Sequence, residues 1–144
     1  MNYRRIVLSC LTALAATASL NAIVIYVKPY TSGPSDGLTW GTAFRTIQPA
    51  LNIAQPGDEV WVAGSREPEN LVIYTPGVAL LGGFSGSETS KDKRPSGYPT
   101  KLTVHTPAAA ITLTPLAAAA TVEGFSVDRR DRETGPGLVC SAMG

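Results

Sequence analysis

The sequence predicts an all-β chain wound into a parallel β-helix, a solenoid in which each turn of the chain adds short strands to parallel sheets. Short segments with alternating apolar and polar residues recur about every 20 residues. Turns rich in Gly and Pro separate these segments, and hairpin dipeptides such as Asn-Gly are missing between them. One turn of a solenoid cannot bury its own apolar face, so the next turn must cover it. An antiparallel sandwich or barrel, which also has regularly spaced short strands, is the alternative.

Four strand-like segments form the main series: 58–63, 77–81, 100–105 and 120–125. Their central apolar residues follow one another at nearly equal intervals, and we expect them to face one interior. These residues are Val60, Leu80, Leu102 and Val122.

A second series of shorter segments lies between the main ones, at 71–74 and 111–113. The words Gly83-Phe84-Ser85 and Gly124-Phe125-Ser126 recur at an interval close to two periods. The Gly-rich run 82–86 is expected to form a turn. A phosphate-binding loop is not expected, because no helix follows that could offer its N-terminus to a phosphate.

The segment before the first of these strands is expected to close the amino end of the solenoid, whose open core and strand edges would otherwise be exposed. Residues 46–54 carry Ile47, Ala50, Leu51 and Ala54 at helical spacing, with Thr46 as N-cap and Pro56-Gly57 as the stop. A strand is expected at 23–27 and a polar loop at 31–37. Trp40 and Phe44 are expected to plug the same end.

Residues 1–22 have the pattern of a secretory signal peptide. Arg4-Arg5 form a basic start, Ile6 to Ala18 is apolar or small, and cleavage sites follow Ala18 or Ala22. The run is too short for the about 20 apolar residues of a membrane span. A lipid anchor on Cys10 is the weaker alternative, because only Ile6 lies between the arginines and the lipobox-like Val7-Leu8-Ser9-Cys10. Three parts are therefore expected: a signal peptide at 1–22, a cap at 23–57 and the first β-helix turns at 58–144.

Several of these segments resemble the start of secreted bacterial proteins with right-handed parallel β-helix repeats, the pectin-lyase-like superfamily. The resemblance covers roughly residues 25–128 and is carried by the segments 25–27, 33–40, 43–51, 54–63, 77–86 and 121–127. The words Pro-Gly-Asp-x-Val at 56–60 and Gly-Gly-Phe-x-Gly at 82–86, in this order, are typical of the fold and not of one activity. The resemblance implies a right-handed coil.

Two departures from such proteins bear on the extent of the chain. The motif at 124–127 normally opens a long series of further turns, whereas little more than a partial turn follows here. The segment 63–68 also departs from the pattern of a Gly and an aromatic residue that relatives commonly carry before the next strand. We therefore expect a truncated frame or a fragment of a longer protein, with the coil cut short at its C-terminal end.

No catalytic residue is predicted. Polysaccharide lyases and hydrolases of this fold carry carboxylates at outward positions of one sheet on neighbouring turns, and no two of the 11 acids here sit at equivalent positions one period apart. Asp58 is expected to cap a turn, and His105, the only histidine, has no acid near it in sequence. No metal site is predicted. Only in an enzyme would Asp128 and Asp131 be weak candidates for Ca²⁺ ligands.

Four residues are candidates for contact with carbohydrate. Trp61 and Tyr74 could stack on sugar rings, although packing against the capping helix or a neighbouring turn is the alternative for both. Arg129 and Arg130 could contact an acidic polysaccharide, although a solvated loop of mixed charge is the alternative.

The leading hypothesis is a secreted or cell-surface β-helix segment without catalysis, with a structural, adhesin-like or carbohydrate-contacting role. The alternative is the N-terminal part of a polysaccharide lyase or glycoside hydrolase whose active site lies on later turns. Without Arg4 and Arg5 the chain has 10 basic and 11 acidic residues, a net charge of −1, so a nucleic-acid partner is not expected. The expected partner is a polysaccharide or cell-surface glycan, with no membrane span after signal cleavage and a location outside the cell, at its surface or at the outer membrane.

Overall fold

The computed structural model describes residues 21–64, 70–104, 109–117, 119–129 and 138–140. Nearly all of the predicted signal peptide lies outside these residues, as do His105, Arg130 and Asp131.

Within the described residues the chain is mostly strand, with one α-helix and one short 3₁₀-helix, η1. The elements in chain order are β1 Val24–Val27, α1 Ile47–Ile53, β2 Glu59–Ala63, β3 Leu71–Ile73, β4 Ala79–Phe84, η1 Lys91–Lys93, β5 Thr100–Val104, β6 Ile111–Leu113, β7 Thr121–Glu123, β8 Phe125–Arg129 and β9 Leu138–Cys140. The predicted all-β class is confirmed. The single strand expected at 120–125 is two strands, which meet at Gly124.

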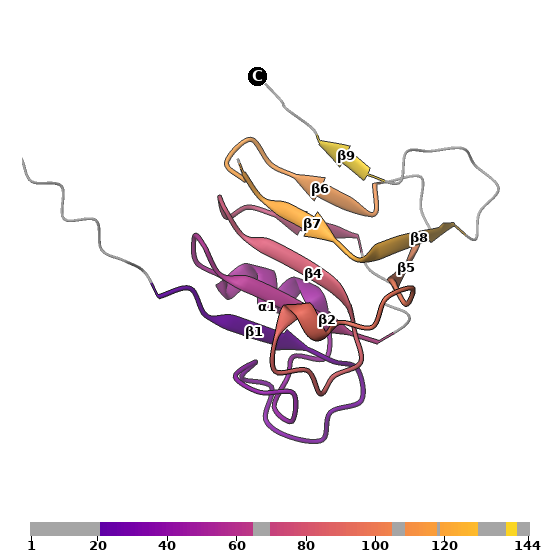
Figure 1. Cartoon of the computed structure of the whole chain (residues 1–144). Helices are drawn as coiled ribbons and strands as arrows, with labels where there is room; N and C mark the ends of the chain where they lie inside the picture. Colours follow the sequence, from indigo (N-terminus) through magenta and orange to yellow (C-terminus); the bar gives the residue numbers. More distant parts are fainter. Residues whose placement is uncertain (1–20, 65–69, 105–108, 118, 130–137, 141–144) are drawn as a thin grey trace, which may run out of the picture.

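Among the described residues, all paired strands are parallel, and they form three sheets. The first sheet is β1-β2-β4-β7, the second is β5-β8 and the third is β3-β6-β9. In each sheet the spatial order is the chain order, so each later strand is added on the same side, as Figure 1 shows for the rise from β1 to β9. The antiparallel alternative is therefore wrong.

The register of the first sheet aligns its apolar residues in one column. Ile25 pairs with Val60, Val60 with Leu80, and Leu80 with Val122. Val60 and Leu80 are fully buried, and Val122 packs against the same core from the last strand of the sheet. The prediction that Val60, Leu80 and Val122 share an interior is confirmed.

The expected near-constant period is wrong beyond Leu80. Leu80 pairs with Val122, two expected periods later, and Leu102 lies in the second sheet, where it pairs with Val127. Leu102 is nevertheless fully buried in the same core cluster. A strand that faces the shared interior has the same alternating apolar pattern whichever sheet it joins. The spacing of these patterns therefore could not show which sheet each strand joins.

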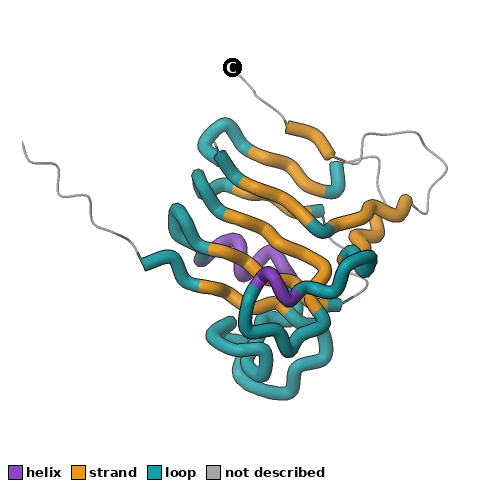
Figure 2. The backbone as a smooth tube through the Cα atoms, viewed as in Figure 1, coloured by secondary structure: helices purple, strands orange, loops and turns teal. Residues whose placement is uncertain are grey.

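Helix α1 packs against β1, β2 and β3, and its apolar stripe joins their core (Figures 1 and 2). The four predicted residues Ile47, Ala50, Leu51 and Ala54 are at most 4% exposed. Thr46 is the N-cap by position, but its side chain makes no capping hydrogen bond. The helix therefore draws its stability from the buried stripe rather than from its cap.

The backbone edges at this end of the sheets are also covered. The Gln48 amide pairs with both backbone groups of Val72 in β3: Nε2 donates to the carbonyl at 3.0 Å and Oε1 accepts from the N–H at 2.9 Å. In β1, Tyr26 donates to the Gly37 carbonyl and accepts from the Phe44 N–H. A side chain and a loop thus take the place of strands at edges that would otherwise be open.

Phe44 and Trp40 have separate roles. Phe44 packs against the main core, as expected of a plug. Trp40 packs in a second cluster on the outer face of the first sheet, so its expected role as a plug of the core is wrong. The Gly37–Phe44 pairing with β1 carries Trp40 past the edge of the sheet to its other face.

The run 82–86, expected to be a turn, instead begins inside β4, which continues to Phe84. Gly82 stacks on Gly124: a Cβ on Gly82 would lie 2.5 Å from the Gly124 carbonyl oxygen. Gly124 therefore pairs with Gly82 and not with Gly83. The two Gly-Phe-Ser motifs are thus displaced by one residue in the strand register. Phe84 consequently faces outward, whereas Phe125 packs against the main core.

Replacing Gln48 with Ala is expected to lower the free energy of unfolding by about 2 kcal/mol, because it leaves the Val72 N–H and C=O without partners. Urea unfolding followed by circular dichroism measures this. Gln55→Ala is the matched control, since its exposed amide makes a local bond at 3.3 Å, and a change within about 0.5 kcal/mol is expected there. Equal effects of the two variants would show that the Gln48 amide does not protect the edge of β3.

Candidate functional site

An aromatic cluster covers the outer face of the first sheet. It consists of Tyr26, Trp40, Trp61 and Phe84. Trp61 and Phe84 lie on neighbouring strands and stack with ring centroids 4.6 Å apart and an interplanar angle of 11°. Trp61 is 4% exposed, and its Nε1 donates to a Glu59 carboxylate oxygen at 2.7 Å. The ring is therefore enclosed, and packing is the role that the structure gives Trp61.

A long loop, residues 85–99, leaves the end of β4 and lies over this cluster before the chain enters β5. The backbone carbonyl of Glu88 accepts a hydrogen bond from Trp40 Nε1 at 2.9 Å. The Glu88 carboxylate turns back and accepts from the backbone N–H groups of Ser85, Gly86 and Ser87 at 2.6 to 3.0 Å. The start of the loop is thus fixed around one buried acid.

The pKa of Glu88 reflects these contacts. Burial of the carboxylate acts to raise its pKa, but hydrogen bonds from the Ser85 side chain and from the backbone of Ser85 and Ser87 outweigh burial and lower the pKa to about 2. Glu88 is therefore ionised at neutral pH, and its role is to hold the loop.

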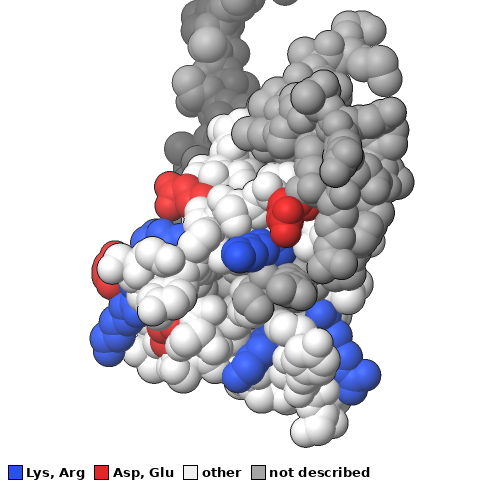
Figure 3. Space-filling view, turned by 90° about the vertical axis from the view of Figure 1, so that its right-hand side faces the viewer, with Lys and Arg blue, Asp and Glu red and all other residues white. Residues whose placement is uncertain are grey.

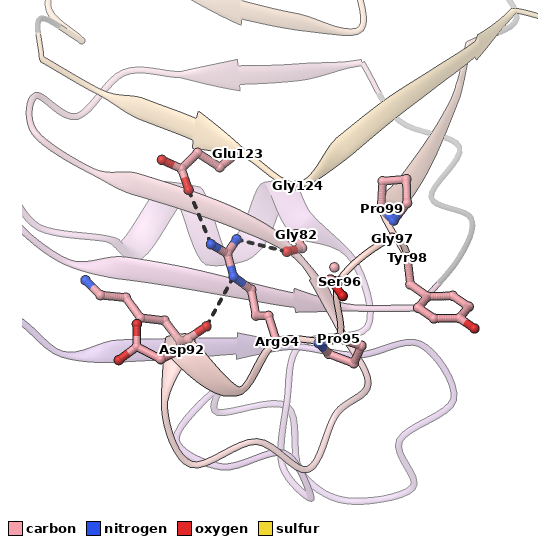
Figure 4. A pocket seen from close by; sticks show the side chains of 12 residues that line it. Gly82, Asp92, Arg94, Pro95, Ser96, Gly97, Tyr98, Pro99, Glu123 and Gly124 are labelled. Carbon is pink, nitrogen blue, oxygen red and sulfur yellow. Dashed lines mark hydrogen bonds and ion pairs between the residues drawn. The ribbon is translucent and has the colours of Figure 1, made fainter.

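Arg94 fixes the far half of the loop across two strands, as Figure 4 shows. Nη1 donates to the Gly82 carbonyl of β4 and Nη2 to the Glu123 carboxylate of β7, each at 3.3 Å. Nε donates to the Lys91 carbonyl at 3.3 Å, and the guanidinium carbon lies 5.5 Å from the centroid of the Phe84 ring. One side chain thus ties η1, the loop and the first sheet together.

Segment 95–99 of the loop separates two hollows. The smaller, of about 460 Å³, is lined by Gly82, Gly83, Lys91, Asp92, Arg94, Pro95, Ser96, Gly97, Tyr98, Pro99, Glu123 and Gly124. The larger, of about 670 Å³, is lined by Gly64, Gly83, Phe84, Ser85, Pro95, Gly97, Tyr98, Pro99 and Lys101. Tyr98 lines both and is 76% exposed. In Figure 4 its ring points away from Arg94.

The charges of the smaller hollow are largely paired within the protein. Lys91 Nζ lies 2.9 Å from a Glu59 carboxylate oxygen, and Arg94 Nη2 lies 3.3 Å from Glu123 Oε2. For Glu59, burial acts to raise the pKa, but hydrogen bonds from Lys91 and Trp61 lower it overall. The Glu59 carboxylate raises the pKa of Lys91 in return. The smaller hollow therefore presents a balanced set of charges.

Of the other predicted contact residues, Tyr74 lies away from these hollows. Tyr74 follows β3, is 56% exposed and lines neither hollow. Arg129 is the last residue of β8, and Arg130 lies outside the described residues. The structure does not bring Trp61 and Tyr74 into one site.

The structure describes some of the residues that were predicted to bind a metal ion or to cap a turn. Asp128 is exposed in β8 opposite Thr103, and Asp131 lies outside the described residues. The described ranges hold no group of three or more His, Cys, Asp or Glu residues that could bind a metal ion. Asp58 is 3% exposed and accepts from the N–H of Gln55 at 2.8 Å and of Ile23 at 3.0 Å, as expected of a residue that caps a turn.

Sequence reasoning missed Glu88, Arg94, Tyr98 and Lys101. Lys101 falls in the strand predicted at 100–105, and the other three fall between two predicted strands, where only turns rich in Gly and Pro are expected. One signal was present: the stretch 85–99, between two strand-like segments, is long and has no alternating apolar pattern. Such a stretch indicates a long loop, and long loops on a rigid scaffold often carry function.

Comparison with known proteins gives no relative: no protein family matches the chain, and no curated protein or solved structure is significantly similar to it. In the part of the chain that the structure describes, no helix is long and apolar enough to cross a membrane.

Acid is expected to destabilise the protein through Glu88. Its pKa is about 2 when folded and near 4.5 when unfolded, so its stabilisation is complete above about pH 5 and is lost as the pH falls toward 2. Glu88→Gln is expected to lower the free energy of unfolding by about 2 kcal/mol at pH 7 and to flatten its dependence on pH between 5 and 2. Urea unfolding over that pH range measures both. An unchanged slope in the variant would contradict the assignment.

Proposed function

We propose that the chain forms an exported right-handed parallel β-helix of the pectin-lyase-like kind, closed at its amino end, which contacts carbohydrate on an outer face without catalysing a reaction. The single observation that supports carbohydrate contact best is the exposed Tyr98 ring on the segment between two hollows. Export is supported by the pattern of Arg4-Arg5 followed by an apolar run.

The β-helix is supported by the order in which the chain visits the sheets. From β4 onward it passes through the first, second and third sheet and then repeats that order with β7, β8 and β9. Parallel strands of one sheet joined by a crossover connection follow a right-handed path in about 98% of proteins. A right-handed coil with three sheets around one core therefore accounts for the pairing.

The closed amino end supports the solenoid as well. Helix α1 covers the core at β1, β2 and β3, and Gln48 and Gly37 satisfy backbone groups of β3 and β1. Such capping is what a solenoid needs to protect its first turn from self-association.

Carbohydrate contact is supported by the chemistry around Tyr98. An aromatic ring offers a flat apolar face to the C–H groups of a sugar, and its hydroxyl offers a polar contact. Polar side chains and backbone groups beside the ring, among them Ser85, Ser96 and Gly83, could position sugar hydroxyls. Pro95 and Pro99 bracket the segment and limit its backbone freedom, so little entropy is lost when a ligand binds.

A polysaccharide-cleaving enzyme is the second candidate, because Asp92 and Glu123 line the same hollow and glycosidases use two carboxyl groups. Against this, Glu123 is engaged by Arg94. Assays for reducing sugars and unsaturated products on pectin, alginate and glycosaminoglycans separate the two. Binding without turnover is expected, and robust turnover would favour the enzyme.

Replacing Tyr98 with Ala is expected to weaken glycan binding by at least about tenfold, because the variant loses the exposed stacking surface. Calorimetric titration with oligosaccharides selected on a glycan array measures the change. Tyr74→Ala is the matched control, since it removes another exposed tyrosine that lines neither hollow, and it should leave binding unchanged. If only the Tyr74 variant loses binding, the site lies beside β3. If no glycan binds at all, the proposed function is wrong.

A further inference from the structure

The carboxylate of Asp58 is buried beside the start of β1 without a counter-ion. Among the charged residues that the structure describes, Asp58 and Glu88 alone are buried, and Asp58 is 3% exposed. Figure 3 shows the usual place of charged side chains, at the surface, where water solvates them. No ion pair between described residues includes Asp58. Because a buried charge is costly unless it is paired, a cation beside this carboxylate would stabilise the fold.

Two backbone N–H groups are the hydrogen-bond donors that the described residues direct at this carboxylate. Oδ2 accepts from Gln55 at 2.8 Å, and Oδ1 accepts from Ile23 at 3.0 Å. Both donors are neutral amides. Glu88 has one more of them, since it accepts from three backbone N–H groups. The charge of Asp58 is therefore the less well compensated of the two.

Ile23 is the residue at which the chain joins the first sheet. The Glu59 N–H donates to the Ile23 carbonyl at 3.0 Å, which extends the pairing of β1 with β2 by one residue before Val24. Asn21 and Ala22, which precede Ile23, are exposed. The peptide bond between Ala22 and Ile23 is one of the two predicted cleavage sites. Cleavage there would leave the pairing of β1 with β2 complete.

We infer that the signal peptide is removed between Ala22 and Ile23, and that the new α-amino group of Ile23 forms an ion pair with the buried Asp58 carboxylate. This inference rests on the proposed export and specifies its processing site. Hydrolysis consumes one water: the Ala22 carbonyl carbon gains the hydroxyl group, and the Ile23 nitrogen gains the hydrogen. The new carboxylic acid releases a proton, and the amine takes one up and is charged at neutral pH.

Cleavage thus changes the charge of a donor that is already in place. The Ile23 nitrogen lies 3.0 Å from Asp58 Oδ1 as a neutral amide and becomes a cation at the same position. Hydrogen bonds that involve ionised groups are about twice as strong as neutral ones. Cleavage after Ala18, the other predicted site, would place the charge on Ser19 and leave the Ile23 amide neutral. The ion pair therefore forms only when cleavage follows Ala22.

The processing site is tested by expressing the full chain in a bacterial host and determining the first residue of the exported protein by mass spectrometry. A chain that begins at Ile23 is expected. An exported chain that begins at Ser19, or at any other residue, would overturn the inference and leave the proposed export standing. A chain that keeps residues 1–22 would contradict both. The outcome is independent of whether the protein binds carbohydrate.

The ion pair is tested by moving the cleavage site. Ala22→Gln removes the small residue that cleavage requires and is expected to yield an exported chain that begins at Ser19. Its melting temperature is expected to lie about 4 °C below that of the chain beginning at Ile23, because a neutral amide replaces the cation. Thermal unfolding followed by circular dichroism measures this. Equal melting temperatures would overturn the ion pair without any change at Asp58.

A second pair of variants assigns the difference to one carboxylate. Asp58→Asn is expected to abolish the difference between the two chains, because a neutral side chain forms no ion pair. Asp36→Asn is the matched control: its exposed carboxylate also accepts a backbone N–H, from Leu38 at 2.9 Å, and its replacement should keep the difference. A difference that survives Asp58→Asn would show that the four additional residues, and not the ion pair, lower the melting temperature.

Discussion

The parallel stacking of inward side chains is the constraint on which the rest of the molecule depends. Val60 rests on Ile25 and is covered by Leu80, which Val122 covers in turn. No strand of the first sheet could bury these residues alone, so each inner strand depends on the neighbour below it and the neighbour above it. Side chains outside the core stack as well: on the outer face the Trp61 ring stacks on the Phe84 ring, although Trp61 pairs with Leu81 and the register shifts before Phe84 pairs with Ala63.

The stack of strands is closed at its amino end by helix α1, Gln48 and the loop up to Phe44. The carbohydrate contact that we propose therefore falls on an outer face of the sheets. The long loop 85–99 is built on such a face. Glu88 and Arg94 hold it at two points, which leaves Tyr98 as its exposed tip.

Local sequence patterns predicted the helix and the strands. They did not predict which sheet each strand joins, because that depends on pairing between strands far apart in the sequence. Alternation located β2, β4 and β5, and the helical stripe located α1, because burial on one face leaves a periodic trace. Which sheet a strand joins depends on the length of chain between strands. The loop 85–99 makes the interval from Leu80 to Leu102 close to one predicted period, so the spacing could not show that Leu102 lies in the second sheet. The site was out of reach for the same reason: Arg94 and Glu123 lie far apart in sequence and meet only because β7 stacks on β4.

The most direct test of the central claim is the pattern of cross-strand nuclear Overhauser effects in a uniformly labelled sample. The account predicts backbone amide-to-Hα contacts of the parallel type from Ile25 to Val60, Val60 to Leu80 and Leu80 to Val122, with Leu102 contacting Val127 instead of joining that series. Antiparallel contacts in the first sheet, or a series that runs from Leu80 to Leu102, would contradict it.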